Sequence, residues 1–297
     1  MQIDGRKINK EIGEKLKQEI EAKNIKPSLG ILCVGDDKAS LSFINVKKRF
    51  GEKYGFAVNI LNLSPRGERS DEVGEIKTNL IKMQSENDGV ILQLPLPEKF
   101  KDYTEEILKV IEKEKDVDDL NEGNFEAPIV LALEKVLEEV EPHLASPINR
   151  GGIVQLKFGI VGLGQVVGLP IKNYLENKIK SNSKEIGSLE IIGHGEFEKI
   201  KNCDVVISGV GSPNLITKEF IKQGSILIDY GCSYDSTSPS LSLQRRRTEQ
   251  LFGDFDKSCY EKAAFYTPVP GCMGPLVVAS LFENVYKAFL KSYEKEN

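Results

Sequence analysis

The chain has 297 residues, of which 40% are hydrophobic and 29% charged, so it can bury the core of one or two domains. Its formal net charge of −5 argues against nucleic acid as a partner. No run approaches the roughly 18 uninterrupted apolar residues of a membrane span, and residues 1–16 lack the apolar core of a signal peptide. We therefore expect a cytoplasmic protein without a membrane partner.

Cysteine and histidine usage argues against a disulfide framework and a metal centre. The five cysteines are odd in number and form no C-x-x-C pair, which favours reduced thiols. The only histidines are His143 and His194, so a histidine-rich metal site and a Ser-His-Asp triad are both hard to build. We expect no catalytic metal.

The first half of the chain alternates helical and strand patterns, ending in a helical pattern over 127–141. Apolar residues at helical spacing alternate with short apolar runs that end near Gly or Pro. This order predicts a mostly parallel sheet with helices on its faces. The expected helices span 8–23, 40–55 and 70–87, and the expected strands span 28–35, 56–63 and 88–97.

Residues 142–152 collect Pro, Ser, Asn and Gly and are the best domain boundary in the sequence. A second alternating unit follows. It contains a strand, glycine turn and helix over 157–178, a polar surface loop over 236–250, and a closing helix over 275–297. Three further strands are expected over 188–195, 203–211 and 224–231.

The glycine turn carries Gly162, Gly164 and Gly168 between a strand and a helix. This context is typical of dinucleotide binding, where glycine permits a tight turn and the helix N-terminus faces a pyrophosphate. The alternative is a turn that only packs helix on strand. His194 and Glu196 lie near the end of the next strand, where a ribose-binding acid is expected, although the spacing suits neither well. No Arg is present there to favour a 2′-phosphate.

Three polar residues of the first half point to a ligand site beyond the strand ends. Lys47 lies one helical turn after Phe43, and partial shielding would lower its pKa for proton transfer. Gln93 is polar within an apolar run, and Asp118 lies on the turn "KDVDD". The alternatives are a solvated lysine, a strand-end cap and a solvated turn.

Together, these motifs resemble the bifunctional methylenetetrahydrofolate dehydrogenase/methenyltetrahydrofolate cyclohydrolase family. The resemblance spans nearly the whole chain and keeps the family's order. It rests on "IDGRKI", "PSLGILCVGDDKASLSFINVKKR", "GVILQLPLP", "KDVDD", "VISGVGSPNLITKEFIKQGSILIDYG", "GDFD" and "YTPVPGCMGPLVVASLFEN". The "LQLPLP" and "TPVPG" stretches are the most specific.

The resemblance implies two α/β domains. Residues 1–143 with 273–297 would form the folate-binding catalytic domain, to which the C-terminal helix returns, and 144–272 a Rossmann-type NAD(P)-binding domain. It also implies a homodimer in one-carbon metabolism, serving purine and amino-acid biosynthesis. The implied reactions are oxidation of 5,10-methylenetetrahydrofolate by NADP⁺, with NAD⁺ as an alternative, and hydrolysis of the methenyl product to 10-formyltetrahydrofolate.

The resemblance assigns catalysis to three residues: Lys47 as the active-site lysine, Gln93 as its hydrogen-bonding partner and Asp118 as the pterin anchor. In this interpretation Asp118 points inward from its turn and Asp116 outward. The implied substrate contacts are Phe43, Leu94, Pro95, Pro268, Val269, Pro270 and Gly271. The implied cofactor contacts are Gly162, Leu163, Gly164, Gln165, Val166, Gly168, His194, Val210, Gly211 and Gly231.

Several positions depart from the family pattern. Phe43 replaces the family tyrosine, and Asp119 replaces the glycine after the pterin-anchoring aspartate. Leu163 and Gly164 stand where the family has the Arg and Ser linked to cofactor phosphate, which predicts a weaker preference for NADP⁺. Other hydroxyl losses fall at Gly195, at Val277 and in the shortened segment 126–130.

These departures leave two alternatives to a working enzyme. One is a non-catalytic folate-binding or partner-binding relative on the same scaffold. The other is a dehydrogenase of another small metabolite, such as a shikimate or amino-acid type, against which "LQLPLP" argues. Loss of the tyrosine hydroxyl predicts that hydrolysis suffers more than hydride transfer.

Overall fold

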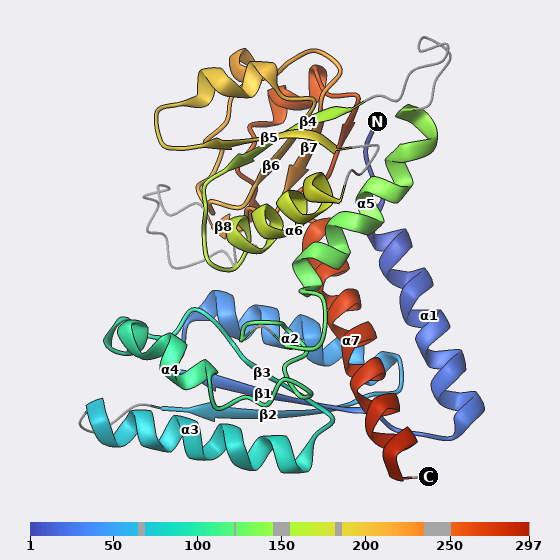
Figure 1. The fold of residues 1–297 in the computed structure, drawn as a ribbon, viewed down its shortest axis with the longest axis vertical. Coiled ribbons are helices and arrows are strands. Elements are labelled where there is room, and N and C mark those ends of the chain that lie inside the picture. Colours follow the sequence, from blue (N-terminus) through green and yellow to red (C-terminus); the bar gives the residue numbers. More distant parts are fainter. Residues whose placement is uncertain (65–68, 122, 145–154, 182–185, 235–250, 297) are drawn as a thin grey trace, which may run out of the picture. The chain divides into compact units, whose positions relative to one another are not determined.

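The computed structural model describes residues 1–64, 69–121, 123–144, 155–181, 186–234 and 251–296 (Figure 1). The chain divides into two compact units. A five-stranded unit contains Met1–Lys7 and Ala132–Leu276, and a three-stranded unit contains Ile8–Leu131 and Val277–Asn297. Both units are α/β with parallel main sheets, which confirms the predicted fold class.

Two segments predicted to be irregular lie largely outside the described residues. The surface loop over 236–250 is one of them. The linker over 142–152 is the other, except that its first three residues continue the helix α5 (Pro128–Leu144). The domain boundaries inferred from the sequence therefore stay a prediction.

The three-stranded unit is built on a parallel sheet in the order β2-β1-β3. All seven residues of β1 pair with β2, and Leu29 to Leu32 pair with β3 on the other side. Beyond β3, Asp116 forms a parallel bridge with Val90, so residues around 116 run beside the sheet like a short fourth strand. The strands are β1 (Ser28–Val34), β2 (Ala57–Leu63) and β3 (Gly89–Leu92).

Local signals at both ends determine where helix α2 begins and ends. The Asp37 carboxylate accepts a hydrogen bond from the Ser40 backbone at 2.8 Å and caps the first turn. Gly55, with φ of +94°, follows the last turn, where a side chain would be strained. The other helices of this part of the chain are α1 (Gly5–Lys23), α2 (Lys38–Lys53), α3 (Arg69–Glu86), α4 (Thr104–Leu108) and the 3₁₀ helix η1 (Glu98–Tyr103).

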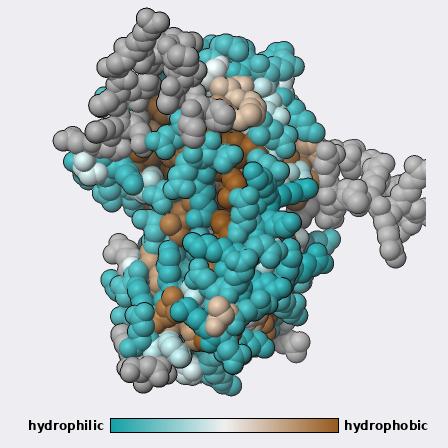
Figure 2. Space-filling view, turned by 90° about the vertical axis from the view of Figure 1, so that its right-hand side faces the viewer, coloured by the Kyte–Doolittle hydropathy of each residue, from teal (hydrophilic) through white to brown (hydrophobic). Residues whose placement is uncertain are grey.

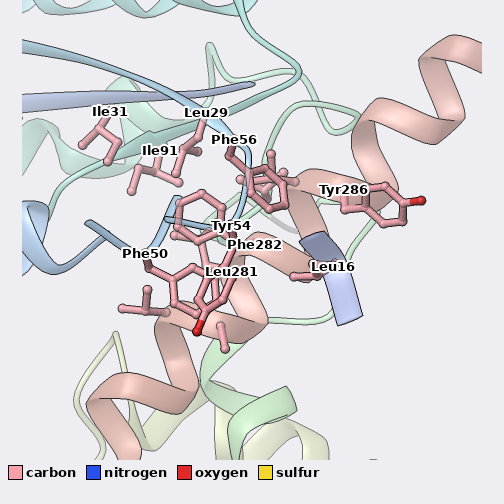
Figure 3. Packing of buried hydrophobic residues seen from close by; sticks show 14 of the residues in the cluster. Leu16, Leu29, Ile31, Phe50, Tyr54, Phe56, Ile91, Leu281, Phe282 and Tyr286 are labelled. Carbon is pink, nitrogen blue, oxygen red and sulfur yellow. The ribbon is translucent and has the colours of Figure 1, made fainter. Parts of the chain in front are cut away.

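The closing helix α7 (Met273–Glu296) supplies much of the core of the three-stranded unit. Figure 3 shows Phe282 among Phe50, Tyr54 and Phe56, with ring centroids 5.2 Å from Phe50 and 4.8 Å from Phe56. A Cβ atom built on Gly51 would lie 2.8 Å from the Phe282 ring, so only glycine permits this approach. The predicted return of the C-terminal helix to the first domain is confirmed.

The five-stranded unit has the order β10-β7-β6-β4-β5, and all of its pairs are parallel. The chain leaves β4 toward β5 on one side and returns to β6 on the other, so the strand order reverses at β4. Ligands of open α/β sheets bind outside the carboxyl ends of the strands at such a switch point. The strands are β4 (Leu156–Val161), β5 (Ile186–Ile192), β6 (Val205–Ser208), β7 (Ile226–Asp229) and β10 (Phe265–Tyr266).

Short elements complete the five-stranded unit. Gln2 bridges Tyr266 and so extends the sheet beyond β10. The four strands predicted from the sequence are present, whereas β10 and the antiparallel pair β8–β9 were missed, because two residues show no periodicity. The remaining elements are α6 (Gly168–Lys180), η2 (Phe197–Asn202), η3 (Lys218–Phe220), β8 (Ser233–Tyr234), β9 (Leu251–Phe252) and η4 (Lys257–Glu261).

Figure 2 shows a face on which hydrophilic residues predominate. Among the described helices, none has the length and apolar character needed to cross a membrane.

Asn284 connects α7 to the turn that carries Asp118. Its buried Nδ2 donates hydrogen bonds to the Val117 carbonyl at 3.0 Å and the Glu126 carbonyl at 2.9 Å. One side chain therefore holds both ends of the segment between these residues.

We expect Asn284→Ala to lower the free energy of unfolding by about 2–4 kcal/mol, because two carbonyls lose their donor in a buried setting. Urea denaturation measures this. Lys287→Ala, at an exposed position of the same helix, is the control and should change stability little. Equal effects of the two substitutions would contradict the assigned role of Asn284.

Candidate functional site

Lys47 is a buried lysine on α2 at the carboxyl end of the three-stranded sheet. Its side chain is only 4% exposed. Its Nζ donates a hydrogen bond to Gln93 Oε1 at 3.0 Å and lies 4.8 Å from the centre of the Phe43 ring. The structure thus brings together Lys47, Gln93 and Phe43, as the sequence predicted.

The buried environment of Lys47 disfavours the charged form of its amine. Burial lowers the pKa of its amine, and the negative charge of Asp118 acts in the opposite direction. An amine with a lowered pKa can give up and regain a proton near neutral pH more readily than a solvated lysine. This position therefore suits proton transfer.

Gln93 follows β3 and is held in one orientation. Its backbone N–H donates to the Leu32 carbonyl at 2.8 Å, and its Nε2 donates to the Leu94 carbonyl at 2.7 Å. Because Nε2 is used in this way, Oε1 is left to face Lys47, whose ammonium can only donate. The amide thus fixes the lysine head group without adding charge.

The turn "KDVDD" presents its aspartates differently from the sequence prediction. Asp116, expected to point outward, is 1% exposed, and its carboxylate accepts hydrogen bonds from the backbones of Leu120 (3.3 Å) and Asn121 (2.7 Å). It points inward because these backbone donors need a partner. Asp118 is half-buried; burial raises the pKa of its carboxyl, and Lys47 counteracts the rise.

Asp119 stands where the family pattern has glycine, and the backbone conformation explains why glycine is favoured at this position. Its φ is +54°, a left-handed conformation that glycine adopts freely and aspartate tolerates at some cost. Burial, with the charges of Asp116, Glu126 and Asp118, raises the pKa of its carboxyl from 3.8 to about 7. The turn therefore carries a carboxyl that resists ionisation.

This raised pKa makes the contribution of Asp119 to stability depend on pH. Between about pH 4 and 7 the unfolded chain has released the proton that the folded chain still holds, so the free energy of unfolding falls as pH rises. Asp119→Asn removes the charge and keeps a residue type that tolerates positive φ.

We expect Asp119→Asn to be more stabilising at pH 8 than at pH 5, by on the order of 1–2 kcal/mol for a partly exposed side chain. Urea denaturation at the two pH values measures the difference. Asp119→Ala is the control, since it removes the same charge and should show the same difference between the two pH values, although alanine tolerates the positive φ less well and lowers stability at both. An Asp119→Asn effect that is independent of pH would contradict the raised pKa.

The glycine turn of the five-stranded unit lies at the switch point of the sheet. Gly162 has φ of +77°, and a Cβ on Gly168 would lie 2.3 Å from the Gly162 carbonyl oxygen, so α6 begins directly against the turn. Nothing lies within 4 Å of a Cβ built on Gly164, which leaves its backbone open to a ligand. The first turn of a helix carries backbone donors that suit a phosphate.

Apolar side chains surround this turn. Leu163, Val166 and Val210 are large hydrophobic residues and all are exposed. Val210 follows β6, and its Cγ2 would lie 3.0 Å from a Cβ on Gly162, so the loop after β6 adjoins the glycine turn. Gly211 continues that loop, and Gln165 is exposed in the turn itself. Neither Leu163 nor Gly164 has a positively charged side chain.

The carboxylate of Glu196 lies at the end of β5, although its spacing in the sequence did not suit that position well. Glu196 Oε2 accepts a hydrogen bond from the Gly193 backbone at 3.0 Å, so the carboxylate lies at the strand's end beside His194. Glu196 Oε1 pairs with Lys199 at 2.6 Å, and Lys199 also lies 3.6 Å from Glu190. The hydrogen bond from Lys199 lowers the pKa of the Glu196 carboxyl.

The remaining predicted contacts are divided between the two units. Leu94 and Pro95 follow Gln93 in the three-stranded unit and share a cis peptide bond. Pro268, Val269, Pro270 and Gly271 follow β10 in the five-stranded unit, and Gly231 follows β7. Their roles in binding stay predictions.

A buried pair of carboxylates, Asp229 and Asp254, lies in the five-stranded unit and was not predicted from the sequence. Both are at most 1% exposed. The stretch "GDFD" enters the sequence analysis only through the family resemblance, because hydrogen bonds between residues 25 positions apart leave no local pattern. Within the described residues, no group of three or more His, Cys, Asp or Glu is arranged to hold a metal ion.

Comparison with known proteins places this geometry in a family. Residues 3–118 match the family model "Tetrahydrofolate dehydrogenase/cyclohydrolase, catalytic domain", and residues 150–293 match "Tetrahydrofolate dehydrogenase/cyclohydrolase, NAD(P)-binding domain". The bifunctional protein FolD of Nautilia profundicola is 31% identical, with 99% of this chain and 98% of the relative covered. FolD of a Sulfurovum species is 32% identical, with coverages of 96% and 97%.

Solved structures agree on the fold. The Trypanosoma brucei N5,N10-methylenetetrahydrofolate dehydrogenase-cyclohydrolase, complexed with NADP cofactor and an inhibitor, aligns with a TM-score of 0.80 at 23% identity, covering 99% of this chain and 98% of its own. The bifunctional 5,10-methylenetetrahydrofolate dehydrogenase/cyclohydrolase of Thermoplasma acidophilum aligns with a TM-score of 0.73 at 25% identity over the full length of both chains.

Proposed function

Because the chain belongs to the tetrahydrofolate dehydrogenase/cyclohydrolase family, we propose that Lys47, Gln93 and Asp118 form its folate site. The family's two activities are the function of this chain: oxidation of 5,10-methylenetetrahydrofolate with NAD(P)⁺ and hydrolysis of the methenyl product, in one-carbon metabolism. The observation that supports the site best is the buried Lys47–Gln93 hydrogen bond, with the charge of Asp118 acting on the same lysine.

The oxidation requires positioning more than acid–base chemistry. The methylene carbon between N5 and N10 loses a hydride, and NAD(P)⁺ accepts it. The remaining positive charge is delocalised over the two nitrogens, so no side chain has to take up a proton. Asp118 would anchor the pterin, whose N–H groups match the acceptor atoms of a carboxylate. Rate then depends on how well the folate is oriented.

The hydrolysis requires proton transfer. Water adds to the methenyl carbon and loses one proton. The resulting hydroxyl loses its own proton to become a carbonyl while the bond to N5 breaks and N5 gains a proton, which leaves a formyl group on N10 and releases one proton overall. Lys47, with its lowered pKa, would relay these protons. Gln93 would hold the amine in place during both steps, because its own orientation is fixed by the Leu94 carbonyl.

Phe43 separates the two activities. Its ring lies against the Lys47 amine but supplies no hydroxyl to hydrogen-bond water or the amine. The hydride step uses no such group, whereas the hydrolysis does. We therefore propose that this chain is a stronger dehydrogenase than cyclohydrolase.

We expect Phe43→Tyr to raise the rate of methenyltetrahydrofolate hydrolysis by on the order of tenfold, since one positioned proton-transfer group contributes at least that much. The dehydrogenase rate should change little. Loss of methenyl absorbance without coenzyme measures hydrolysis directly. Phe43→Leu, which removes the ring and adds no hydroxyl, is the control; no gain for Phe43→Tyr over this control would contradict the role given to the missing hydroxyl.

Asp119 supports a second candidate, a folate-binding relative with little turnover. It places a carboxyl with a raised pKa directly after Asp118, where the family resemblance has glycine. In that case folate would bind with ordinary affinity while neither reaction proceeds with either coenzyme.

We also propose that the coenzyme site discriminates against a 2′-phosphate through Glu196. A carboxylate at the end of this strand accepts a hydrogen bond from a ribose 2′-hydroxyl and repels a phosphate there. Lys199, the nearby cation, is already shared between Glu196 and Glu190. With Leu163 and Gly164 at the turn, little positive charge is left for NADP⁺.

We expect Glu196→Gln to raise the ratio of kcat/KM for NADP⁺ to that for NAD⁺ roughly tenfold, because a doubly charged phosphate and a carboxylate about 5 Å apart in water repel by about 1–2 kcal/mol. Glu190→Gln is the matched control, since it also frees Lys199 but removes a charge from within β5. Equal shifts in both variants would assign the effect to Lys199, and no shift would contradict the proposal.

The assembly and setting of the protein are further parts of the proposal. On the family resemblance, we propose a homodimer formed through the NAD(P)-binding domain. The same resemblance supports a cytoplasmic enzyme whose 10-formyltetrahydrofolate serves purine and amino-acid biosynthesis.

A further inference from the structure

The Asp254 carboxylate is buried and organises the loop that follows β6. Asp254 is 0% exposed. Its Oδ2 accepts hydrogen bonds from the Ser208 hydroxyl and the Val210 backbone, both at 2.7 Å, and its Oδ1 accepts one from the Ser212 backbone at 2.8 Å. Three donors from five consecutive residues therefore meet on one side chain.

This loop occupies one side of the switch point. β6 pairs directly with β4, and the loop Ser208–Ser212 adjoins the glycine turn, since Val210 would lie 3.0 Å from a Cβ on Gly162. In open α/β sheets the nucleotide binds between the loops on either side of this point. The conformation of Ser208–Ser212 therefore sets the shape of one wall of the coenzyme site.

A second buried carboxylate holds Asp254 in place. Asp229 Oδ1 accepts hydrogen bonds from the backbones of Gly231 (2.9 Å) and Asp254 (3.1 Å), and its Oδ2 accepts one from Phe255 (3.1 Å). A Cβ on Gly231 would lie 2.3 Å from Asp254 Oδ1, and one on Gly253 would lie 2.1 Å from Asp229 Oδ2. Glycine at these two positions is what lets the loops close around the carboxylates.

The pair is costly for folding, which suggests a reason for it other than stability. None of the salt bridges found among the described residues involves either carboxylate. Burial and the charge of Asp254 raise the pKa of Asp229 to about 7. Burying a carboxylate without a cation costs free energy, and one use of buried polar or ionic groups is to specify a conformation.

We propose that Asp254 is a positioning residue for the coenzyme: it fixes the Ser208–Ser212 loop in the conformation that receives the nucleotide, with Asp229 supporting it from β7. This inference rests on the proposed coenzyme site of the five-stranded unit. Asp254 itself, being fully buried, does not touch the ligand. It acts through the backbone of Val210 and Ser212.

Asp254→Asn tests the proposal. The substitution keeps the size of the side chain, but its amide group donates where the carboxylate accepted, so either the Val210 or the Ser212 backbone donor is left facing another donor. We expect the Kd for NADH and NADPH, measured by fluorescence titration, to rise at least tenfold. Folate binding should change much less than coenzyme binding, because Lys47, Gln93 and Asp118 lie in the other unit.

Asp256→Asn is the matched control. It lies two residues further along the same "GDFD" stretch and removes the same charge, but its carboxylate caps η4 through Ser258 and makes no contact with Ser208–Ser212. A coenzyme Kd that is unchanged in Asp254→Asn while thermal stability falls would overturn the proposal and leave Asp254 a purely structural residue. Equal effects of the two substitutions on coenzyme binding would overturn it as well.

Ser208→Ala is the second test, and it applies if Asp254→Asn does not fold. Ser208 is fully buried, and the substitution removes one of the three donors while Asp254 keeps the other two. A coenzyme Kd that rises several-fold supports the proposal, and an unchanged Kd overturns it. Wild-type protein that binds neither coenzyme would contradict the proposed function itself, which separates that failure from a failure of this inference.

Discussion

The hydrogen bond between Lys47 and Gln93 is the interaction on which the proposed chemistry of this protein depends. A buried ammonium is unstable without a partner, and a carboxylate in direct contact would hold it protonated. The neutral amide oxygen of Gln93 orients the amine and leaves its pKa low. For this, the side-chain amide of Gln93 must not rotate, and its hydrogen bond to the Leu94 carbonyl prevents the rotation.

The rest of the three-stranded unit holds this pair and the neighbouring turn in place. The Asp37 cap begins the helix that carries Lys47, and β3 ends at Gln93. Asp116 satisfies the donors of the turn from inside, and Asn284 fixes it from α7. Asp118 is thereby presented beside the lysine by groups that have no chemical role of their own. A departure such as Asp119 alters the charge of the turn without removing those supports.

Strand ends and helix faces were predictable because they follow from local periodicity, and the α/β class and the closing helix followed from them. Lys47, Gln93 and Phe43 could be grouped in advance, because parallel strands deliver their carboxyl ends to one edge. The inward position of Asp116 could not be read from the sequence, since it depends on which backbone donors the turn leaves unpaired. Asp229 and Asp254 meet through contacts distant in sequence, and the site of Glu196 depends on how one turn bends back to Gly193.

The five-stranded unit shows the same division between ligand-facing and supporting groups. The glycine turn and the loop after β6 lie at the switch point, while Asp254, whose carboxylate accepts hydrogen bonds from that loop, is buried. If the coenzyme binds there as proposed, few exposed groups determine its specificity, and single substitutions should shift the balance between the two coenzymes. Lys47, Gln93 and Asp118, to which we assign the folate chemistry, lie in the other unit.

The most direct test of these assignments is a turnover measurement on the wild-type protein. Methylenetetrahydrofolate is mixed with NADP⁺ or NAD⁺, and reduced nicotinamide and methenyl absorbance are followed together. We expect reduced coenzyme to form while methenyltetrahydrofolate accumulates, because hydride transfer is intact and Phe43 slows hydrolysis. Absence of reduced coenzyme with either nucleotide, from protein that still binds folate, would contradict an active dehydrogenase and leave a folate-binding relative.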